Sequence, residues 1–159
     1  MSPDLIAPVE PQLELLGHFR AELGEPLELG QTLWGRRRVI PIAGGAFEGP
    51  SLRGTILPGG ADWQVVHPDG MATIDTRYTL QTHDGALISV ATQGVRHGPP
   101  EVLARIAAGE LVDPAEYYFR VSIRYEAAES EYAWLNRIVA VASAVRLAAT
   151  VVYDAYAVR

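Results

Sequence analysis

The chain has 159 residues, of which 48% are hydrophobic and 20% charged, and its formal net charge is −6. This length and composition are typical of one globular domain, here residues 1–159, and unlike a disordered segment. Because an acidic chain repels phosphate backbones, we expect no nucleic-acid partner. Cysteine and lysine are both absent, which excludes disulfides, thiolate chemistry and Schiff-base catalysis.

The N-terminus predicts no targeting signal. Its first residues include an acid, Asp4, where a signal peptide carries positive charge, and no apolar run follows. The most apolar stretch, residues 135–152, is interrupted by Arg137 and Arg146, so it is a poor candidate for a membrane span. We therefore expect no membrane contact and a cytoplasmic location.

Alternation of polar and apolar residues dominates the chain and predicts strands. In chain order, the predicted strands cover residues 13–23, 36–42, 46–57, 62–67, 72–82, 86–95, 117–126, 136–146 and 150–158. A short helix is predicted at 100–108, because prolines stand at its start and Gly109 follows its end. Single helical turns are expected at 113–116 and 130–136.

This series of elements predicts an all-β fold. Roughly eight to ten strands with about one or two short helices form either a sandwich or an antiparallel β-barrel. We favour the barrel, because closure removes the exposed edge strands that a cytoplasmic protein must otherwise protect.

Two turns set the expected register of the central strands. The turn at residues 68–70 places Trp63 opposite Asp75. The Asp-Gly loop that follows is interpreted as a two-residue hairpin, which places Thr92 opposite Arg77. The resulting face carries Trp63, Asp75, Arg77, Thr79 and Thr92.

This face has two interpretations. If it lines the barrel, Trp63 and the pair of Asp75 and Arg77 form a polar pocket beside an aromatic wall. If it faces solvent, the same pair is an ordinary surface ion pair. Tyr78 lies on the opposite, more apolar face of the same strand.

Other candidate residues lie in the second half of the chain. Tyr118 and Arg120 share the polar face of segment 117–126. Arg120 is either solvated or a bidentate clamp for a carboxylate or enolate oxygen. Trp134, on a predicted turn, is a candidate cap for a barrel mouth. The 4 histidines show no metal-ligand spacing, so we expect no metal and no cofactor.

Several runs follow one another along most of the chain. They read PIAGGAFEGP (41–50), LPGGADW (57–63), DTRY (75–78) with HDGA (83–86), DPAEYYFR (113–120) and YAWLNR (132–137). Together they resemble the DUF3237 (UPF0311) family. The resemblance implies a compact antiparallel β-barrel and no agreed activity or cofactor. The chain departs from the family pattern at His83, where an acid is usual, and in its Ala/Val-rich C-terminal strands.

Two functions fit these residues. The first is a cofactor-free acid/base enzyme, of the isomerase, cyclase or lyase type, acting on a small apolar or aromatic carbonyl compound. Asp75 is then the general base, and Arg120 or Tyr78 stabilises the developing oxyanion. The substrate-binding candidates are Trp63, Arg77, Tyr118 and Trp134.

The second function is a non-catalytic barrel that binds a small hydrophobic ligand, with Arg120 as its only polar anchor. Self-association is a separate possibility. Segment 138–145 has almost no polar residues, so it is predicted to be buried on both faces, either within the monomer or across a homodimer.

Overall fold

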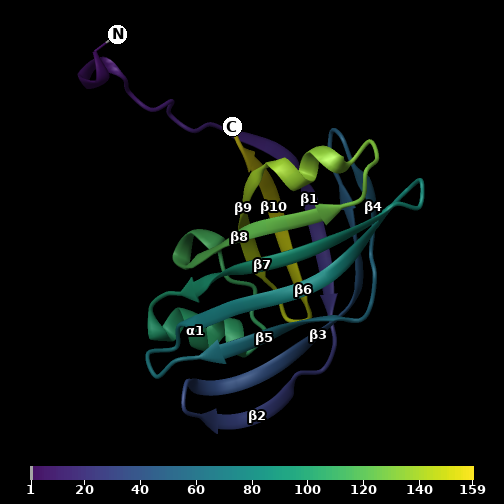
Figure 1. The fold of residues 1–159 in the computed structure, drawn as a ribbon. Helices are drawn as coiled ribbons and strands as arrows, with labels where there is room; N and C mark the ends of the chain where they lie inside the picture. Colours follow the sequence, from purple (N-terminus) through teal and green to yellow (C-terminus); the bar gives the residue numbers. More distant parts are fainter. Residues whose placement is uncertain (1) are drawn as a thin grey trace.

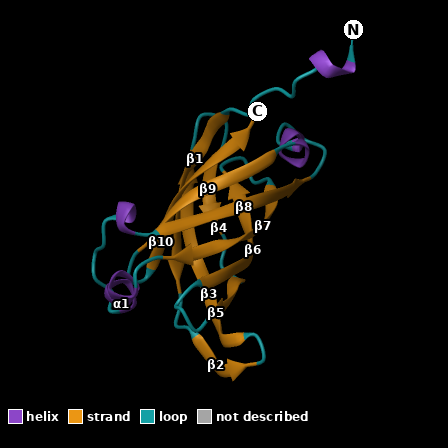
Figure 2. Cartoon of the chain, turned by 90° about the vertical axis from the view of Figure 1, so that its left-hand side faces the viewer, coloured by secondary structure: helices purple, strands orange, loops and turns teal. Residues whose placement is uncertain are grey.

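A computed structural model describes residues 2–159 (Figures 1 and 2). Its strands are β1 (Leu13–Leu23), β2 (Leu27–Thr32), β3 (Gly35–Glu48), β4 (Arg53–Ile56), β5 (Gly60–Val66), β6 (Ala72–Thr82), β7 (Leu87–His97), β8 (Tyr118–Ala127), β9 (Val139–Arg146) and β10 (Thr150–Val158). The helical elements are α1 (Pro100–Ala107) and the 3₁₀ turns η1 (Pro3–Leu5), η2 (Pro114–Glu116) and η3 (Ala133–Arg137).

The strands form one antiparallel sheet of ten that closes on itself. Its order is β1-β10-β9-β8-β7-β6-β4-β3-β2, with β5 pairing both β3 and β6. Because β1 also pairs with β3, the path from β1 to β3 becomes a ring, and β2 extends from one end of it (Figures 1 and 2). The prediction of an antiparallel β-barrel with a short helix is confirmed.

The strands differ from the predicted ones mainly around β3. The predicted break before residue 46 is wrong, because β3 continues through Gly44 and Gly45 at φ of 150° and 148°. Glycine adopts these angles without a clash, so the strand bends without ending. The predicted strand 46–57 is replaced by the end of β3 and the short β4. Strand β2 was not predicted, because its nearly complete exposure leaves no alternation of polar and apolar residues in its sequence.

The C-terminal strands alternate small residues inside with larger apolar residues outside. On β9, Ala140, Ala142 and Ala144 are buried, whereas Val139 is 65% exposed. Small inward side chains leave space in the barrel, because closely packed interiors are otherwise filled. This chain alone therefore buries only one face of segment 138–145.

The two ends of the barrel are covered differently. At one end, α1 buries Val102 and Ile106 and approaches the turn between β5 and β6. At the other end, the Tyr132 hydroxyl beside η3 donates a hydrogen bond to Asp84 in the turn between β6 and β7, at 3.0 Å. No helix within residues 2–159 has the length and apolarity needed to cross a membrane.

Tyr125 offers a test of the packing inside the barrel. Its buried hydroxyl has no hydrogen-bond partner among residues 2–159. We expect Tyr125→Phe to raise the free energy of unfolding by about 1 kcal/mol, because the variant no longer buries an unpaired hydroxyl. Thermal and urea denaturation measure the change.

Tyr153→Phe is the matched control, because the hydroxyls of Tyr153 and Tyr78 are hydrogen-bonded to each other. Loss of the Tyr153 hydroxyl leaves the Tyr78 hydroxyl without that partner. We expect it to lower the free energy of unfolding by about 1 kcal/mol. Destabilisation of similar size in Tyr125→Phe would contradict the argument.

Candidate functional site

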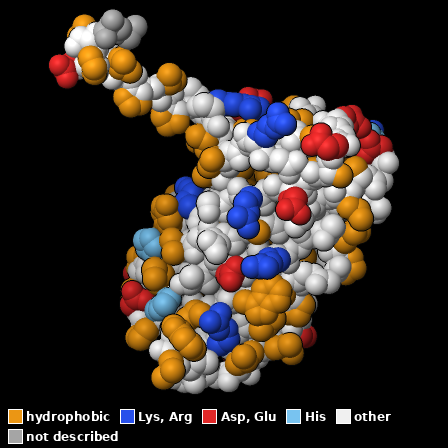
Figure 3. Space-filling model, in the orientation of Figure 1, with side chains coloured by type: hydrophobic (Ala, Val, Ile, Leu, Met, Phe, Trp, Pro, Cys, Tyr) orange, Lys and Arg blue, Asp and Glu red, His pale blue; other side chains and the backbone are white. Residues whose placement is uncertain are grey.

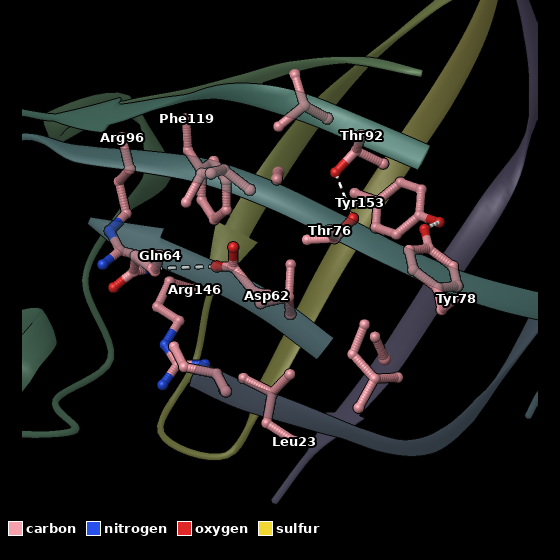
Figure 4. A pocket seen from close by; sticks show the side chains of 17 residues that line it. Leu23, Asp62, Gln64, Thr76, Tyr78, Thr92, Arg96, Phe119, Arg146 and Tyr153 are labelled. Carbon is pink, nitrogen blue, oxygen red and sulfur yellow. Dashed lines mark hydrogen bonds between the residues drawn. The ribbon is translucent and has the colours of Figure 1, made fainter. Parts of the chain in front are cut away.

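The barrel interior holds a cavity of about 70 Å³ (Figure 4). A water molecule occupies about 30 Å³ in the liquid, so the cavity has room for roughly two waters. Its walls are mainly apolar, with polar groups in three places. One end carries Asp62, Gln64, Arg96 and Arg146, the middle carries Thr76 and Thr92, and the other end carries Tyr78 and Tyr153.

Strand register brings these polar groups together. Asp62 on β5 lies opposite Thr76 on β6, which lies opposite Thr92 on β7. Directly opposite residues of antiparallel strands share a face, so all three point into the barrel. The Thr76 and Thr92 hydroxyl oxygens lie 2.5 Å apart.

Asp62 is the acid of the cavity and is 8% exposed. One carboxylate oxygen accepts the Asp75 backbone N–H at 3.0 Å, and the other accepts Gln64 Nε2 at 3.1 Å. Burial raises the pKa of the Asp62 carboxyl, against the opposing effect of these hydrogen bonds. A carboxylate whose pKa is raised is a stronger base than an ordinary aspartate, which suits it to proton transfer.

Arg38 fixes the orientation of Gln64. Its Nε and Nη2 donate to Gln64 Oε1 at 3.0 and 2.7 Å. Because a guanidinium only donates, the Gln64 carbonyl must face Arg38, and the amide nitrogen is left to face Asp62. The inward residues of β3 and β5 thus form a chain from Arg38 through Gln64 to Asp62.

Two further arginines reach the same end of the cavity. Arg96 on β7 and Arg146 at the end of β9 are half-buried, and within residues 2–159 neither guanidinium has a hydrogen-bond or ion-pair partner. The Arg96 guanidinium lies 5.5 Å from the centre of the Phe119 ring. Burial lowers the pKa of Arg96 to about 10, and the neighbouring charge of Arg146 acts in the same direction. Both arginines remain cations at neutral pH.

The other end of the cavity is neutral and aromatic. Burial raises the pKa of the Tyr78 and Tyr153 hydroxyls, so both stay protonated at neutral pH. The Tyr153 ring stacks on Phe19 with a centroid separation of 4.7 Å. These tyrosines can donate hydrogen bonds to a ligand oxygen, and their rings can contact its apolar part.

Among the site residues named from sequence, Tyr78 is the one that lines the cavity. Trp63 is 39% exposed and Arg77 is exposed, and both lie on outward positions of β5 and β6. The Asp75 side chain does not line the cavity either, although its backbone N–H binds Asp62.

The predicted pairing of Thr92 with Arg77 is wrong, because Arg77 lies opposite Ala91. The reason is the length of the Asp-Gly loop. The Thr82 N–H bonds to the Ala86 carbonyl, so the loop has one residue more than the predicted two. A shift of one residue moves every side chain to the other face of a strand.

The remaining candidates lie apart from the cavity. Tyr118 and Arg120 border a depression on the outer surface, where the guanidinium lies 5.3 Å from the Tyr118 ring centre. Trp134 on η3 is half-buried against the core, at the barrel end opposite α1. Figure 3 shows the face in front of β6, β7 and β8, on which arginine side chains lie among apolar and acidic ones. The roles of these residues remain predictions.

Four polar residues of the cavity were not predicted from the sequence: Asp62, Gln64, Arg96 and Arg146. A signal for Asp62 was present, because the turn that sets Trp63 opposite Asp75 also sets Asp62 on the face of Tyr78. Arg96 and Arg146 lie near strand ends, where alternation gives no reliable face. Only the pairing of distant strands shows that these residues meet.

Comparison with known proteins identifies the family. The model described as "Protein of unknown function (DUF3237)" matches residues 11–158. A UPF0311 protein of Bradyrhizobium diazoefficiens is 41% identical over 138 residues, which are 87% of this chain and 90% of that relative. A β-barrel-like protein of Acinetobacter baumannii has a TM-score of 0.86 at 51% identity, covering 96% of this chain and 99% of that chain.

A more distant likeness shows the fold alone. The structure of an enzyme from Penicillium herquei has a TM-score of 0.73 at 20% identity, covering 97% of this chain and 98% of that chain. The family resemblance predicted from the ordered sequence runs is confirmed by the closer matches, and the chain belongs to the DUF3237 family.

Proposed function

We propose that this protein is a cofactor-free acid/base enzyme, of the isomerase, cyclase or lyase type, acting on a small apolar or aromatic carbonyl compound in the barrel cavity. One observation carries the proposal. The buried Asp62 carboxylate, with its raised pKa, faces an apolar cavity that also presents arginine and tyrosine donors. Asp62 replaces Asp75 as the proposed base, because its side chain lines the cavity.

The arrangement suits proton abstraction next to a carbonyl group. Asp62 removes the proton from carbon, and the electron pair of the broken C–H bond moves onto the carbonyl oxygen as an enolate. Arg96, Arg146 or the Tyr78 hydroxyl stabilises that oxygen by donating hydrogen bonds. Asp62 then returns the proton to carbon or to a leaving group, so no cofactor is consumed.

The fold agrees with this proposal without identifying a substrate. The Penicillium herquei protein with the same fold is an enzyme, so this barrel architecture is compatible with catalysis. Fold-level analogy carries no information on the reaction here, which has to be argued from the cavity residues.

Carbon-proton exchange in D₂O tests the proposal directly. The protein is incubated with acetoacetate, phenylpyruvate and acetophenone, and deuterium at the carbon beside each carbonyl is measured by mass spectrometry. Protein-dependent exchange in at least one compound is the supporting result. Compounds that bind, as judged by a thermal shift, but never exchange favour the second candidate, a non-catalytic binding barrel with the same apolar cavity.

We also propose that a second copy of the chain covers the β9/β10 outer face. The apolar residues of this face are Val139, Val141, Val145, Val152, Tyr156 and Val158. They are exposed or half-buried. The polar pair among them is Ser143 and Asp154, and the Asp154 carboxylate is hydrogen-bonded to His18 at 2.5 Å. Two such faces can meet without repulsion between like charges.

Val141→Lys tests this self-association. We expect the substitution to weaken a dimer by at least about tenfold, because it buries an unpaired charge in an apolar interface. Ser89→Lys, on the outer side of β7, is the matched control. Light scattering across a concentration series measures the dissociation, and a monomeric wild-type chain at high concentration would contradict the proposal.

A further inference from the structure

We propose that the natural ligand of the cavity is a small organic anion, whose carboxylate or equivalent pair of oxygens is bound by Arg96 and Arg146. The inference rests on the proposed function for this site and deepens it by naming the charge of the substrate. A neutral ketone satisfies the proposed chemistry as well, so the charge of the ligand rests on separate observations.

The charges at this end of the cavity do not balance. Of the arginines around it, Arg38 is already satisfied, because it donates to Gln64 and lies 3.7 Å from Glu28. The side chains of Arg96 and Arg146 have no such partner among residues 2–159.

Asp62 supplies only part of the missing negative charge. Its charge acts on both Arg96 and Arg146, but one carboxylate cannot balance two cations. Its two oxygens are also occupied by the Asp75 N–H and by Gln64, and burial of its carboxyl favours the neutral form. A partly buried cation without a full counter-charge is costly, so a bound anion would remove the imbalance.

The two guanidiniums are placed to act together. Arg96 lies opposite Phe119 on β8, and the Arg146 backbone N–H donates to the hydroxyl of Tyr117, the residue directly before β8, at 3.0 Å. They therefore flank β8 from β7 and β9, and Figure 4 shows both at the same end of the cavity. Arginine presents paired N–H donors that match the two oxygens of a carboxylate.

The rest of the cavity limits the ligand to a small apolar body. The space beyond the arginines is bordered by Ile40, Ile74, Phe119 and Val121 and ends at the neutral tyrosines. A volume of about 70 Å³ is roughly half of the about 150 Å³ cavity that holds a benzene ring, so it accommodates a chain of about two or three carbon atoms. The ligand class is therefore a monoanion with a short apolar chain.

Propionate and propionamide form the test pair, because they share one shape and differ in charge. Their binding to the wild-type chain and its variants is measured by calorimetry and thermal shift at pH near 7. We expect propionate to bind at least about tenfold more tightly than propionamide. We expect Arg96→Gln and Arg146→Gln each to weaken propionate binding by about tenfold or more, with propionamide unchanged.

The control is Arg124→Gln, which removes an exposed arginine on the outer side of β8. Equal binding of propionate and propionamide, or unchanged propionate binding in the folded Arg96 and Arg146 variants, would overturn the inference. So would a lack of saturable binding of both propionate and formate. If a Gln variant does not fold, the Arg-to-Lys variant at the same position is measured instead. It keeps the charge and loses the paired donors, so we expect it to bind the anion more weakly than the wild-type chain does.

Asp62→Asn separates this inference from the proposed function. Removal of a negative charge is expected to keep or strengthen propionate binding, whereas it abolishes carbon-proton exchange. Anion binding without exchange in the wild-type chain supports the inference and counts against the enzyme. Exchange with neutral ketones, without a preference for anions, supports the proposed enzyme and counts against the inference.

Discussion

Asp62→Asn lowers the rate of carbon-proton exchange by about 100- to 10,000-fold while the barrel stays folded, if Asp62 is the general base. The amide has nearly the same shape and cannot accept the proton. Its oxygen can still accept the Asp75 N–H, so the backbone of β6 keeps its partner. Exchange rates are measured by mass spectrometry, and circular dichroism checks the fold.

Asp75→Asn is the matched control for this variant. Its side chain does not line the cavity, and its backbone N–H is unchanged by the substitution. We expect exchange within about twofold of the wild-type rate. A large loss in Asp75→Asn with little loss in Asp62→Asn would favour the base predicted from the sequence over the one that the cavity contains.

The pH dependence gives a second measure of Asp62. Because burial raises its pKa in the folded state, the folded chain favours the protonated carboxyl. The stability of the wild-type chain relative to Asp62→Asn is therefore highest below the ordinary aspartate pKa of about 3.9, and it falls as pH rises through the raised value. Melting temperatures of both proteins between acidic and neutral pH measure this difference. Carbon-proton exchange has the opposite pH dependence. Its rate increases as pH rises, because Asp62 acts as a base only when it is deprotonated.

Gly45→Ala is expected to lower the free energy of unfolding by more than about 4 kcal/mol, a large share of the stability of a typical domain. Gly45 pairs with Ala21 on β1 and with Ile56 on β4, where the barrel closes. A Cβ there would overlap the Arg20 carbonyl oxygen, and the φ of 148° is unfavourable for alanine. Backbone atoms cannot move aside without breaking the β1–β3 pairing.

Gly59→Ala isolates the backbone strain. Gly59 has a φ of 109°, but no atom lies within 4 Å of a Cβ at this position. Strain alone costs about 1–3 kcal/mol, so we expect a loss in that range. Urea denaturation of both variants measures the difference, and equal losses would show that close approach at the barrel seam contributes nothing.

The local pattern of the sequence determined the class of the fold. Polar and apolar residues alternate in most strands, and this period depends only on which residues are adjacent in the chain. The ordered runs that contain Trp63 and Trp134 also determined the family, and with it the barrel. Tyr78 was placed on an apolar face for the same local reason, and that face proved to line the cavity.

The tertiary structure decided which side chains meet inside the barrel. Thr92 joined Thr76 because the loop before β7 has one residue more than predicted, and such a shift reverses a face. Arg96 on β7 and Arg146 on β9 lie on either side of β8. Strands β1 and β3 pair only when the ring closes. These contacts depend on the pairing of strands far apart in the chain, which alternation along a single strand does not encode.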